Sequence, residues 1–242
     1  MSVRRKTKLF LSANHPRAYS AVVRARETLV KSGWKVWLLG KSPKKVFSTM
    51  YARQLWGGSE SSSGTGSGLA QTKQVKEQLP MLLKELNVRT ILDAPCGDFH
   101  WMRTVELNVD HYIGADIVEE VVADNARKHA GSGRRFVVLD IISDPLPASD
   151  LILCRDCLVH LSLRDASMAI ANFKKSQSKY LLMTTFVERN RNPNIQTGQW
   201  RPLNLQKPPF NFPEPLRLIR EDCTIEHDFD KCLGLWRIAD LP

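Results

Sequence analysis

From Thr72 onward, the hydrophobic positions of the chain alternate between two periods. Short apolar runs with the length of β-strands are separated by segments in which apolar residues recur every three or four positions, as on one face of a helix. The strand-like runs cover residues 89–92, 111–115, 135–139, 150–154, 180–185, 224–227 and 233–238, and the helix-like segments cover 74–86, 118–129 and 163–175. This alternation predicts an α/β domain with a mostly parallel sheet and crossover helices.

The chain before Thr72 has a weaker pattern. Residues 16–31 carry apolar positions at helical spacing, and residues 34–39 have the composition of a strand or an apolar anchor. The stretch 56–68 is rich in Gly and Ser, as linkers are, but it opens beside Leu55 and Trp56. The region 46–71 is therefore either an ordered lid or a plain linker.

A second irregular region covers residues 186–221. Between residues 186 and 215 the chain has no helix or strand pattern and contains six prolines. Structureless stretches of this length inside a compact domain are usually functional or disordered, and the aromatic residues Trp200, Phe210 and Phe212 argue for order. We expect either a long loop that selects a substrate or a folded cap over the core.

The charge of the chain is unevenly distributed. The 242 residues carry a net charge of +10, yet residues 1–53 contain thirteen Lys and Arg and a single acid, Glu27. The rest of the chain is therefore close to neutral, and the basic character belongs to an extension over residues 1–45. Such an extension can bind an anionic polymer, or it can be a solvated terminus.

The sequence also limits the location of the protein. The apolar run 9–11 near the basic start is too short for a secretory signal, and no run approaches the roughly 18 residues of a membrane span. Five cysteines without a framework fit a reducing compartment. We expect a cytoplasmic protein, whose oligomeric state the sequence leaves open.

Three successive predicted strands end in, or run directly into, an acid. These acids are Asp93, Asp116 and Asp140. Loops at the carboxyl ends of parallel strands are where α/β sheets bind ligands. A carboxylate such as Asp116 can accept hydrogen bonds from both hydroxyls of a ribose, and Asp140 could accept one from an adenine amino group. Helix capping explains any one of these acids alone, whereas all three together favour a nucleoside site.

The segment 90–99, TILDAPCGDF, resembles the first motif of the class I S-adenosylmethionine-dependent methyltransferases. Asp93 and Gly97 match that motif, while Pro95 and Phe99 replace its first and third glycines. The stretches WGG, DAPCGDFHWM, TGQWRPLNL and PPFNFPEPL together resemble one bacterial family of these enzymes over residues 46–242. The resemblance implies a Rossmann-like domain with seven strands, the last antiparallel, and helices on both faces.

The same resemblance implies S-adenosylmethionine (SAM) as the cofactor and methyl transfer as the activity. The loop after the first strand would pass beneath the methionine part, Asp116 would hold the ribose, and Asp140 would border the adenine. The residues implied at the cofactor are Asp93, Ala94, Pro95, Cys96, Gly97, Asp98, Asp116, Ile117, Asp140, Ile141 and Arg155.

Three other interpretations fit less well. A nicotinamide-binding Rossmann domain needs G-x-G-x-x-G, which is missing here. Methyltransferases acting on exocyclic amines would carry Asn or Asp before Pro-Pro and an aromatic after the fourth strand, and residues 154–158 do not. Cys154 and Cys157 with Cys223, His227 and Cys232 suggest zinc, but positions three apart in a strand point to opposite faces, so we expect no metal.

Methyl transfer to a hydroxyl needs an aligned acceptor and a base. Asp156 and His160 follow the fourth strand, at the edge of the expected acceptor pocket, and His100 follows the first loop. These three are the candidate bases, although His160 could be a core residue and Asp156 could be an ion-pair partner.

The long loop gives the substrate hypothesis. Trp200, Arg201 and Asn204 combine a flat apolar face with planar hydrogen-bonding groups, which suits a sugar. The leading hypothesis is methyl transfer to a hydroxyl of a small molecule or glycan. The alternatives are an RNA or other anionic-polymer methyltransferase docked through the basic extension, and a binding module without turnover.

Overall fold

The computed structural model describes residues 33–225 and 228–242, and its contacts divide the chain into two units, residues 1–41 and 42–242. In the first unit, residues 33–38 are helical, and the rings of Trp34 and Trp37 stack with their centroids 4.7 Å apart. A strand over residues 34–39 is therefore wrong, because a spacing of three residues brings two side chains together on one helix face. The helix expected at 16–31 lies outside the described residues.

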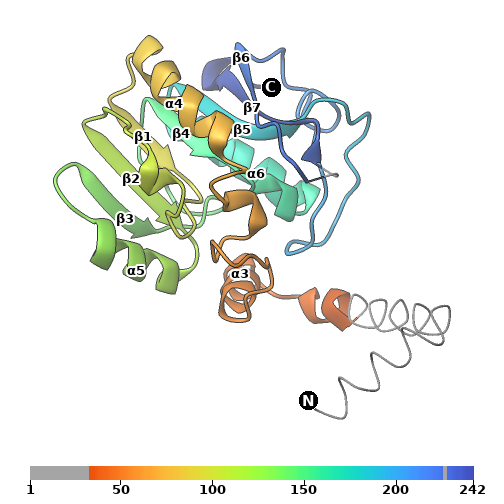
Figure 1. Ribbon diagram of the computed structural model, residues 1–242. Coiled ribbons are helices and arrows are strands. Elements are labelled where there is room, and N and C mark those ends of the chain that lie inside the picture. Colours follow the sequence, from red (N-terminus) through yellow and green to blue (C-terminus); the bar gives the residue numbers. More distant parts are fainter. Residues whose placement is uncertain (1–32, 226–227) are drawn as a thin grey trace, which may run out of the picture. The chain divides into compact units, whose positions relative to one another are not determined.

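The second unit is built on a seven-stranded sheet (Figure 1). Its strands are β1 (Thr90–Asp93), β2 (His111–Asp116), β3 (Arg134–Val138), β4 (Leu151–Cys154), β5 (Tyr180–Phe186), β6 (Arg217–Arg220) and β7 (Lys231–Arg237). The strand order is β3-β2-β1-β4-β5-β7-β6. β7 runs opposite to the other six strands, so it is antiparallel to both β5 and β6, and all other neighbouring strands are parallel. The mostly parallel sheet with an antiparallel last strand is confirmed.

The four main helices of this unit are α3 (Pro43–Ala52), α4 (Lys73–Glu85), α5 (Glu119–His129) and α6 (Leu163–Lys175). The strands separate two layers of core, because successive side chains of a strand point to opposite faces. Ile91 packs with residues of α4 and α5, whereas its neighbour Leu92 packs with residues of α6. Helices on both faces are therefore confirmed.

Two predicted elements need correction. Residues 224–225 of the expected strand 224–227 are not in a strand, and residues 226–227 lie outside the description. The partner of β7 is instead β6, an edge strand whose Leu218 is exposed, so its hydrophobic pattern is weak. Helix α3 was not predicted, although Ser42 caps its first turn and Pro43 opens it, which is a helix-start signal.

The long segment between β5 and β6 is folded against the sheet. Leu203, Leu205, Phe210 and Phe212 are buried in the same core layer as α6, and the Phe212 ring packs edge-on against Trp236. Burial of these apolar side chains holds the segment in place without helix or strand hydrogen bonds.

Candidate functional site

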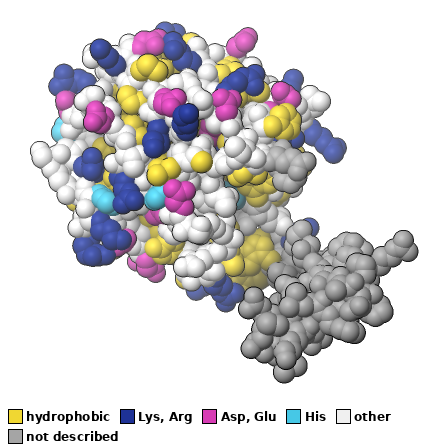
Figure 2. Space-filling model, in the orientation of Figure 1, with side chains coloured by type: hydrophobic (Ala, Val, Ile, Leu, Met, Phe, Trp, Pro, Cys, Tyr) yellow, Lys and Arg dark blue, Asp and Glu magenta, His cyan; other side chains and the backbone are white. Residues whose placement is uncertain are grey.

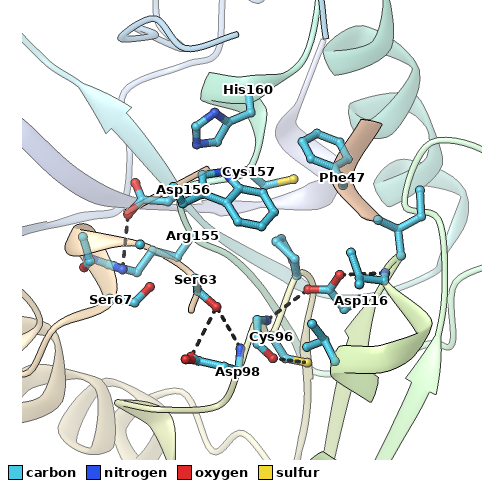
Figure 3. Close-up of a pocket in the computed structure, with 18 of the residues that line it drawn as sticks. Phe47, Ser63, Ser67, Cys96, Asp98, Asp116, Arg155, Asp156, Cys157 and His160 are labelled. Atoms are coloured by element: carbon cyan, nitrogen blue, oxygen red, sulfur yellow. Dashed lines mark hydrogen bonds and ion pairs between the residues drawn. The ribbon is translucent and has the colours of Figure 1, made fainter. Parts of the chain in front are cut away.

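A cavity of about 300 Å³ lies at the carboxyl ends of the parallel strands (Figure 3). The residues that follow β1, β2, β3 and β4 form one side of it, and α3 with the serine–glycine segment, defined here as residues 61–67, forms the other. Open α/β sheets bind ligands at this edge, and the volume lies at the lower limit of small-molecule sites.

Most residues expected at the site reach this cavity. They are Asp93, Pro95, Cys96, Gly97, Asp98, Asp116, Ile117, Asp140, Ile141, Arg155, Asp156, His160 and Trp200. We call the part formed after β1, β2 and β3 the β1–β3 end, and the part formed after β4 the β4 end. Ala94 does not line the cavity, because its methyl group is fully buried in the core layer of α6.

Asp116, at the end of β2, organises the β1–β3 end. Its Oδ2 accepts a hydrogen bond from the backbone N of Gly97 at 3.1 Å, and its Oδ1 accepts one from Val118 at 2.9 Å. Burial raises the pKa of Asp116 to about 6, although these amide hydrogen bonds oppose the shift. A carboxylate has about four acceptor positions, so the group can accept from a ligand as well as from the backbone.

Two further carboxylates lie at the β1–β3 end. Asp93 is almost completely buried and accepts a hydrogen bond from the hydroxyl of Tyr112. Burial raises its pKa to about 7, against the effect of that hydrogen bond. Asp140 is half-buried after β3 and accepts a hydrogen bond from Ile142 N at 2.9 Å. With Asp98 and Asp116, four carboxylates surround this end of the cavity and favour a ligand that donates hydrogen bonds or carries positive charge.

The serine–glycine segment is bound to the loop after β1. Asp98 accepts hydrogen bonds from Ser61 Oγ at 2.8 Å and from Ser62 N at 2.8 Å, and its own N donates to Ser63 Oγ at 2.8 Å. Gly97 has a φ of +53°, and a Cβ there would lie 2.3 Å from Ser63 Oγ. A side chain at Gly97 would therefore push Ser63 away, and the segment is ordered against the loop; a lid over the cavity stays a prediction.

Phe99 stands where the resemblance expects a third glycine. Its backbone adopts the left-handed conformation that glycine favours, with a φ of 57°. Its ring is 1% exposed and packs against the rings of Tyr112 and Phe136, each with its centroid 5.2 Å away. Aromatic packing offsets the cost of that backbone conformation, so the loop keeps its shape without the glycine.

Aromatic side chains of α3 and the turn after it also line the cavity. Phe47, Tyr51 and Trp56 face it, and the rings of Phe47 and Trp56 lie nearly parallel with centroids 6.3 Å apart. The sequence interpretation flagged Trp56 within a candidate lid but missed Phe47, because α3 itself was missed. The helix-start signal at Ser42 and Pro43 could have revealed it.

The β4 end begins at Asp156, whose φ of 52° turns the chain out of the sheet. Its carboxylate lies 2.6 Å from Lys231 Nζ and 3.2 Å from Arg155 Nη1. Burial raises the pKa of Asp156, but the two cations outweigh burial and lower it to about 2. Asp156 is therefore an anion at neutral pH and a very weak base.

His160 lies beside Asp156 at the same end of the cavity (Figure 3). Its Nδ1 is 3.1 Å from the backbone oxygen of Gln199, which can only accept a hydrogen bond. Burial lowers the pKa of His160, so the neutral ring carries its proton on Nδ1 and a lone pair on Nε2. Of the candidate bases at the cavity, His160 is the one whose protonation state suits proton removal.

Comparison with known structures agrees with this architecture. Human N-acetylserotonin methyltransferase, solved in complex with SAM, superposes with a TM-score of 0.54 at 14% identity, covering 95% of this chain and 69% of that one. The chain has the class I methyltransferase fold. Magnesium protoporphyrin IX methyltransferase from Synechocystis PCC 6803 gives a TM-score of 0.46 at 14% identity, over 64% of this chain and 82% of that one.

A third structure is the amino pentose methyltransferase from Micromonospora echinaspora, with a TM-score of 0.40 and 16% identity, over 45% of this chain and 48% of that chain. No protein-family model and no curated protein sequence matches the chain. The class I methyltransferase fold is thus established by structure, at identities that leave the activity to be argued from the site.

His100 lies outside the cavity of this class I methyltransferase fold. Its Nε2 is 3.2 Å from Glu60 Oε1, and its side chain borders a separate hollow beside Arg103 and Lys128. The backbone N of His100 donates a hydrogen bond to Asp98 Oδ1 at 3.2 Å, and its side chain is not among those that line the cavity. His100 is therefore not positioned to act on a molecule bound there, and we remove it from the proposed bases.

Arg201 and Asn204 also do not line the cavity. The Arg201 guanidinium donates to the backbone oxygens of Pro193, Leu158 and Leu161 at 2.7 to 3.1 Å. Asn204 Nδ2 donates to the backbone oxygen of Arg189 at 2.9 Å. Both side chains are almost fully buried, so they hold the long loop in shape, and only Trp200 of the three expected substrate residues faces the cavity.

Residues 33–225 and 228–242 contain neither a metal-ligand cluster nor a membrane-spanning helix. In this part of the chain, no group of three or more His, Cys, Asp or Glu side chains is arranged to hold a metal ion. The helices described there are also too short or too polar to cross a bilayer. His227 of the suggested zinc set lies outside the described residues.

Proposed function

We propose that this chain is a SAM-dependent methyltransferase that transfers a methyl group to a hydroxyl of a small-molecule or glycan acceptor. One observation carries the proposal: a single cavity has four carboxylates at its β1–β3 end and, at its β4 end, the ring of His160, whose Nδ1 lies 3.1 Å from a backbone oxygen and so leaves the lone pair on Nε2. The first set suits a nucleoside with a positive charge, and the second suits removal of a hydroxyl proton.

The residues at the β1–β3 end fit this cofactor. Asp116 lines the cavity, and its carboxylate can accept from ribose hydroxyls in addition to the backbone amides that orient it. The loop after β1, with Asp93 and Asp98, would hold the amino acid part, while Asp140 and Ile141 would border the adenine. SAM, when bound, supplies a methyl group on a positively charged sulfur. Arg155 is engaged by Glu221 and Gly66, so we leave it out of the cofactor contacts.

The residues at the β4 end would orient and deprotonate the acceptor. His160 Nε2 accepts the hydroxyl proton, while the backbone oxygen of Gln199 fixes the ring. Asp156 stays ionised and accepts a hydrogen bond from a neighbouring hydroxyl instead of taking a proton. Trp200 is 44% exposed and offers a flat face to a sugar ring. A polyol with two adjacent hydroxyls matches this pair of side chains.

The RNA alternative depends on the basic extension, most of which lies outside the described residues. On the face of the molecule drawn in Figure 2, Lys and Arg side chains are interspersed with Asp and Glu side chains. Nucleic-acid sites need a continuous basic surface, so this face does not favour a polyanion. A small-molecule or glycan acceptor remains the proposal.

The test is a titration followed by a transfer assay on the full chain. Calorimetry should detect binding of SAM and of S-adenosylhomocysteine (SAH). The protein is then incubated with isotopically labelled SAM and a panel of monosaccharides, methyl glycosides and phenols, and products are identified by mass spectrometry. Absence of heat with both nucleosides would contradict the cofactor assignment. Binding without transfer to any hydroxyl would contradict the acceptor assignment and favour the non-catalytic alternative.

A further inference from the structure

Four charged side chains form a buried cluster behind the β4 end. Arg155 and Asp156 follow β4, Glu221 follows β6, and Lys231 opens β7. Arg155 Nε lies 3.2 Å from Glu221 Oε2, and Lys231 Nζ lies 3.4 Å from the same oxygen and 2.6 Å from Asp156 Oδ2. Glu221 and Lys231 are each 2% exposed and Arg155 is 6% exposed.

A buried group of charges is weak evidence for a purely stabilising role. Removing charged groups from water costs several kcal/mol each, and well-packed apolar side chains often replace buried ion pairs without loss. The second oxygen of Glu221, Oε1, is buried and has no partner among the described residues, so the cluster is not fully compensated. The contacts of the cluster with the rest of the protein therefore indicate its role.

The cluster touches the serine–glycine segment. Arg155 Nη2 donates a hydrogen bond to the backbone oxygen of Gly66 at 2.8 Å. A Cβ on Gly66 would lie 3.1 Å from Asp156 Oδ2 and 3.7 Å from Lys231 Nζ, so the backbone of the segment rests directly on the ion pair. One group of charges thus contacts both the β4 end of the cavity and the serine–glycine segment.

We propose that Lys231 and Glu221 are positioning residues for the acceptor: Lys231 directs the ionised Asp156 carboxylate into the cavity, and Glu221 aims Arg155 at Gly66, which closes the serine–glycine segment over the bound acceptor. The inference rests on the proposed function. Neither residue lines the cavity, and each acts through the neighbour that does.

The main test compares two lysines that each bond an aspartate at 2.6 Å. Lys231 is buried against Asp156, whereas the Lys179 side chain is 70% exposed and bonds Asp150 at the opposite end of the strands. In Lys231→Met, the carboxyl pKa of Asp156, followed by carbon NMR titration, should rise by at least one unit, because a cation in contact is lost. In the control Lys179→Met, the Asp156 titration should not change.

Kinetics then separate positioning from a structural role. With the hydroxyl acceptor that the wild type methylates fastest, Lys231→Met should raise the acceptor KM by about tenfold. The SAH Kd should stay unchanged, and Lys231→Arg should restore the KM. An unchanged acceptor KM in Lys231→Met, or equal losses in Lys231→Met and Lys179→Met, would overturn the proposal.

Glu221→Gln tests the contact between Arg155 and the serine–glycine segment. Loss of its charge frees the Arg155 guanidinium, so amide hydrogen exchange in residues 61–67 should become at least several-fold faster with SAH present, while α6 exchanges as in the wild type. Unchanged exchange in 61–67 would overturn the role of Glu221. If no acceptor is methylated at all, the proposed function fails on its own, and the NMR titration and hydrogen exchange still decide whether the cluster controls Asp156 and the segment.

Discussion

The two ends of the cavity are assembled from contacts of different range. At the β1–β3 end, Asp93, Asp116 and Asp140 bond groups that are 2 to 19 residues away, within consecutive strand and loop units. At the β4 end, Arg155 and Asp156 bond groups that are 66 to 89 residues away. These three carboxylates of the first end are held by local chain segments, and only Asp98 there bonds the more distant serine–glycine segment, whereas the ion pairs of the second end form only when β6 and β7 are in place.

The pKa values of the carboxylates at the two ends are shifted in opposite directions. Burial dominates at the first end and raises the pKa of Asp93 to about 7 and that of Asp116 to about 6. Cations overcome burial at the second end, where the pKa of Asp156 is lowered to about 2. Stability linked to Asp93 is therefore lost as the pH rises from about 4 to about 7, and stability linked to Asp156 is lost as the pH falls from about 4 to about 2.

Substitution of His160 should have the largest effect, and only at the β4 end. In His160→Gln, turnover should fall by about 10² to 10⁴, the usual contribution of a positioned base, because Nε2 is replaced by an amide. The SAH Kd, measured by calorimetry, should not change. A loss of SAH binding together with turnover would mean that the two ends are not separable.

Asp93→Asn should change how stability depends on pH. The folded wild type holds a proton on Asp93 up to about pH 7, so it should lose about 4 kcal/mol of stability between about pH 4 and pH 7. An asparagine cannot ionise and still accepts the Tyr112 hydrogen bond, so the variant should lack this contribution and keep the smaller slope that Asp116, with a pKa of about 6, adds over the same range. Urea unfolding at several pH values measures it.

The control for that experiment is Asp124→Asn. Asp124 is bonded to Lys128 and Arg127 on the exposed face of α5, and its pKa is lowered chiefly by the hydrogen bond from Lys128. It therefore titrates below pH 4, and its replacement should leave the slope between pH 4 and pH 7 intact. Equal slopes for the wild type and Asp93→Asn would show that Asp93 is ionised in the folded protein.

Asp116→Asn tests the β1–β3 end by binding. The amide keeps one acceptor oxygen but loses the charge that receives the ribose hydroxyls, so SAH affinity should fall by about 10- to 100-fold. Turnover at saturating SAM should fall less than affinity. The experiment goes against the assignment if calorimetry gives the same Kd as for the wild type or for Asp124→Asn.

The smallest effect is expected for Gly97→Ala. A methyl group there meets Ser63 Oγ at 2.3 Å, and the φ of +53° disfavours alanine, so stability should drop by about 1 to 2 kcal/mol in urea unfolding. Ser63→Ala in the same chain removes the clash but not the backbone strain, and should recover part of the loss. No recovery would mean that Ser63 does not approach Gly97 in solution.

The range of the contacts explains what the sequence could predict. Six of the seven strands and helices α4, α5 and α6 lie where their hydrophobic period placed them, and α6 has the predicted bounds 163–175. Asp93, Asp116 and Asp140 were found because each lies at the end of its own strand or just after it. No such signal marks Glu221 and Lys231, the partners of Arg155 and Asp156. In the sequence they look like ordinary surface charges, and only the pairing of β6 with β7 brings them together.

Other misses have local causes. The edge strand β6 was missed because its two apolar residues stand between two arginines and only Ile219 is buried, so no apolar run marks it. Arg201 and Asn204 were assigned to a substrate because their side chains are polar, and polarity cannot distinguish a group that binds a ligand from one that binds the backbone of its own loop.

The way Arg201 holds the long loop has a consequence for how this protein could change. Its guanidinium bonds backbone oxygens, and so does Asn204, so the shape of the loop depends little on the side chains of their neighbours. Exposed positions such as Trp200 are then free to vary while the scaffold persists. Under the proposed function, exchanging these few residues would change the acceptor without redesigning the loop.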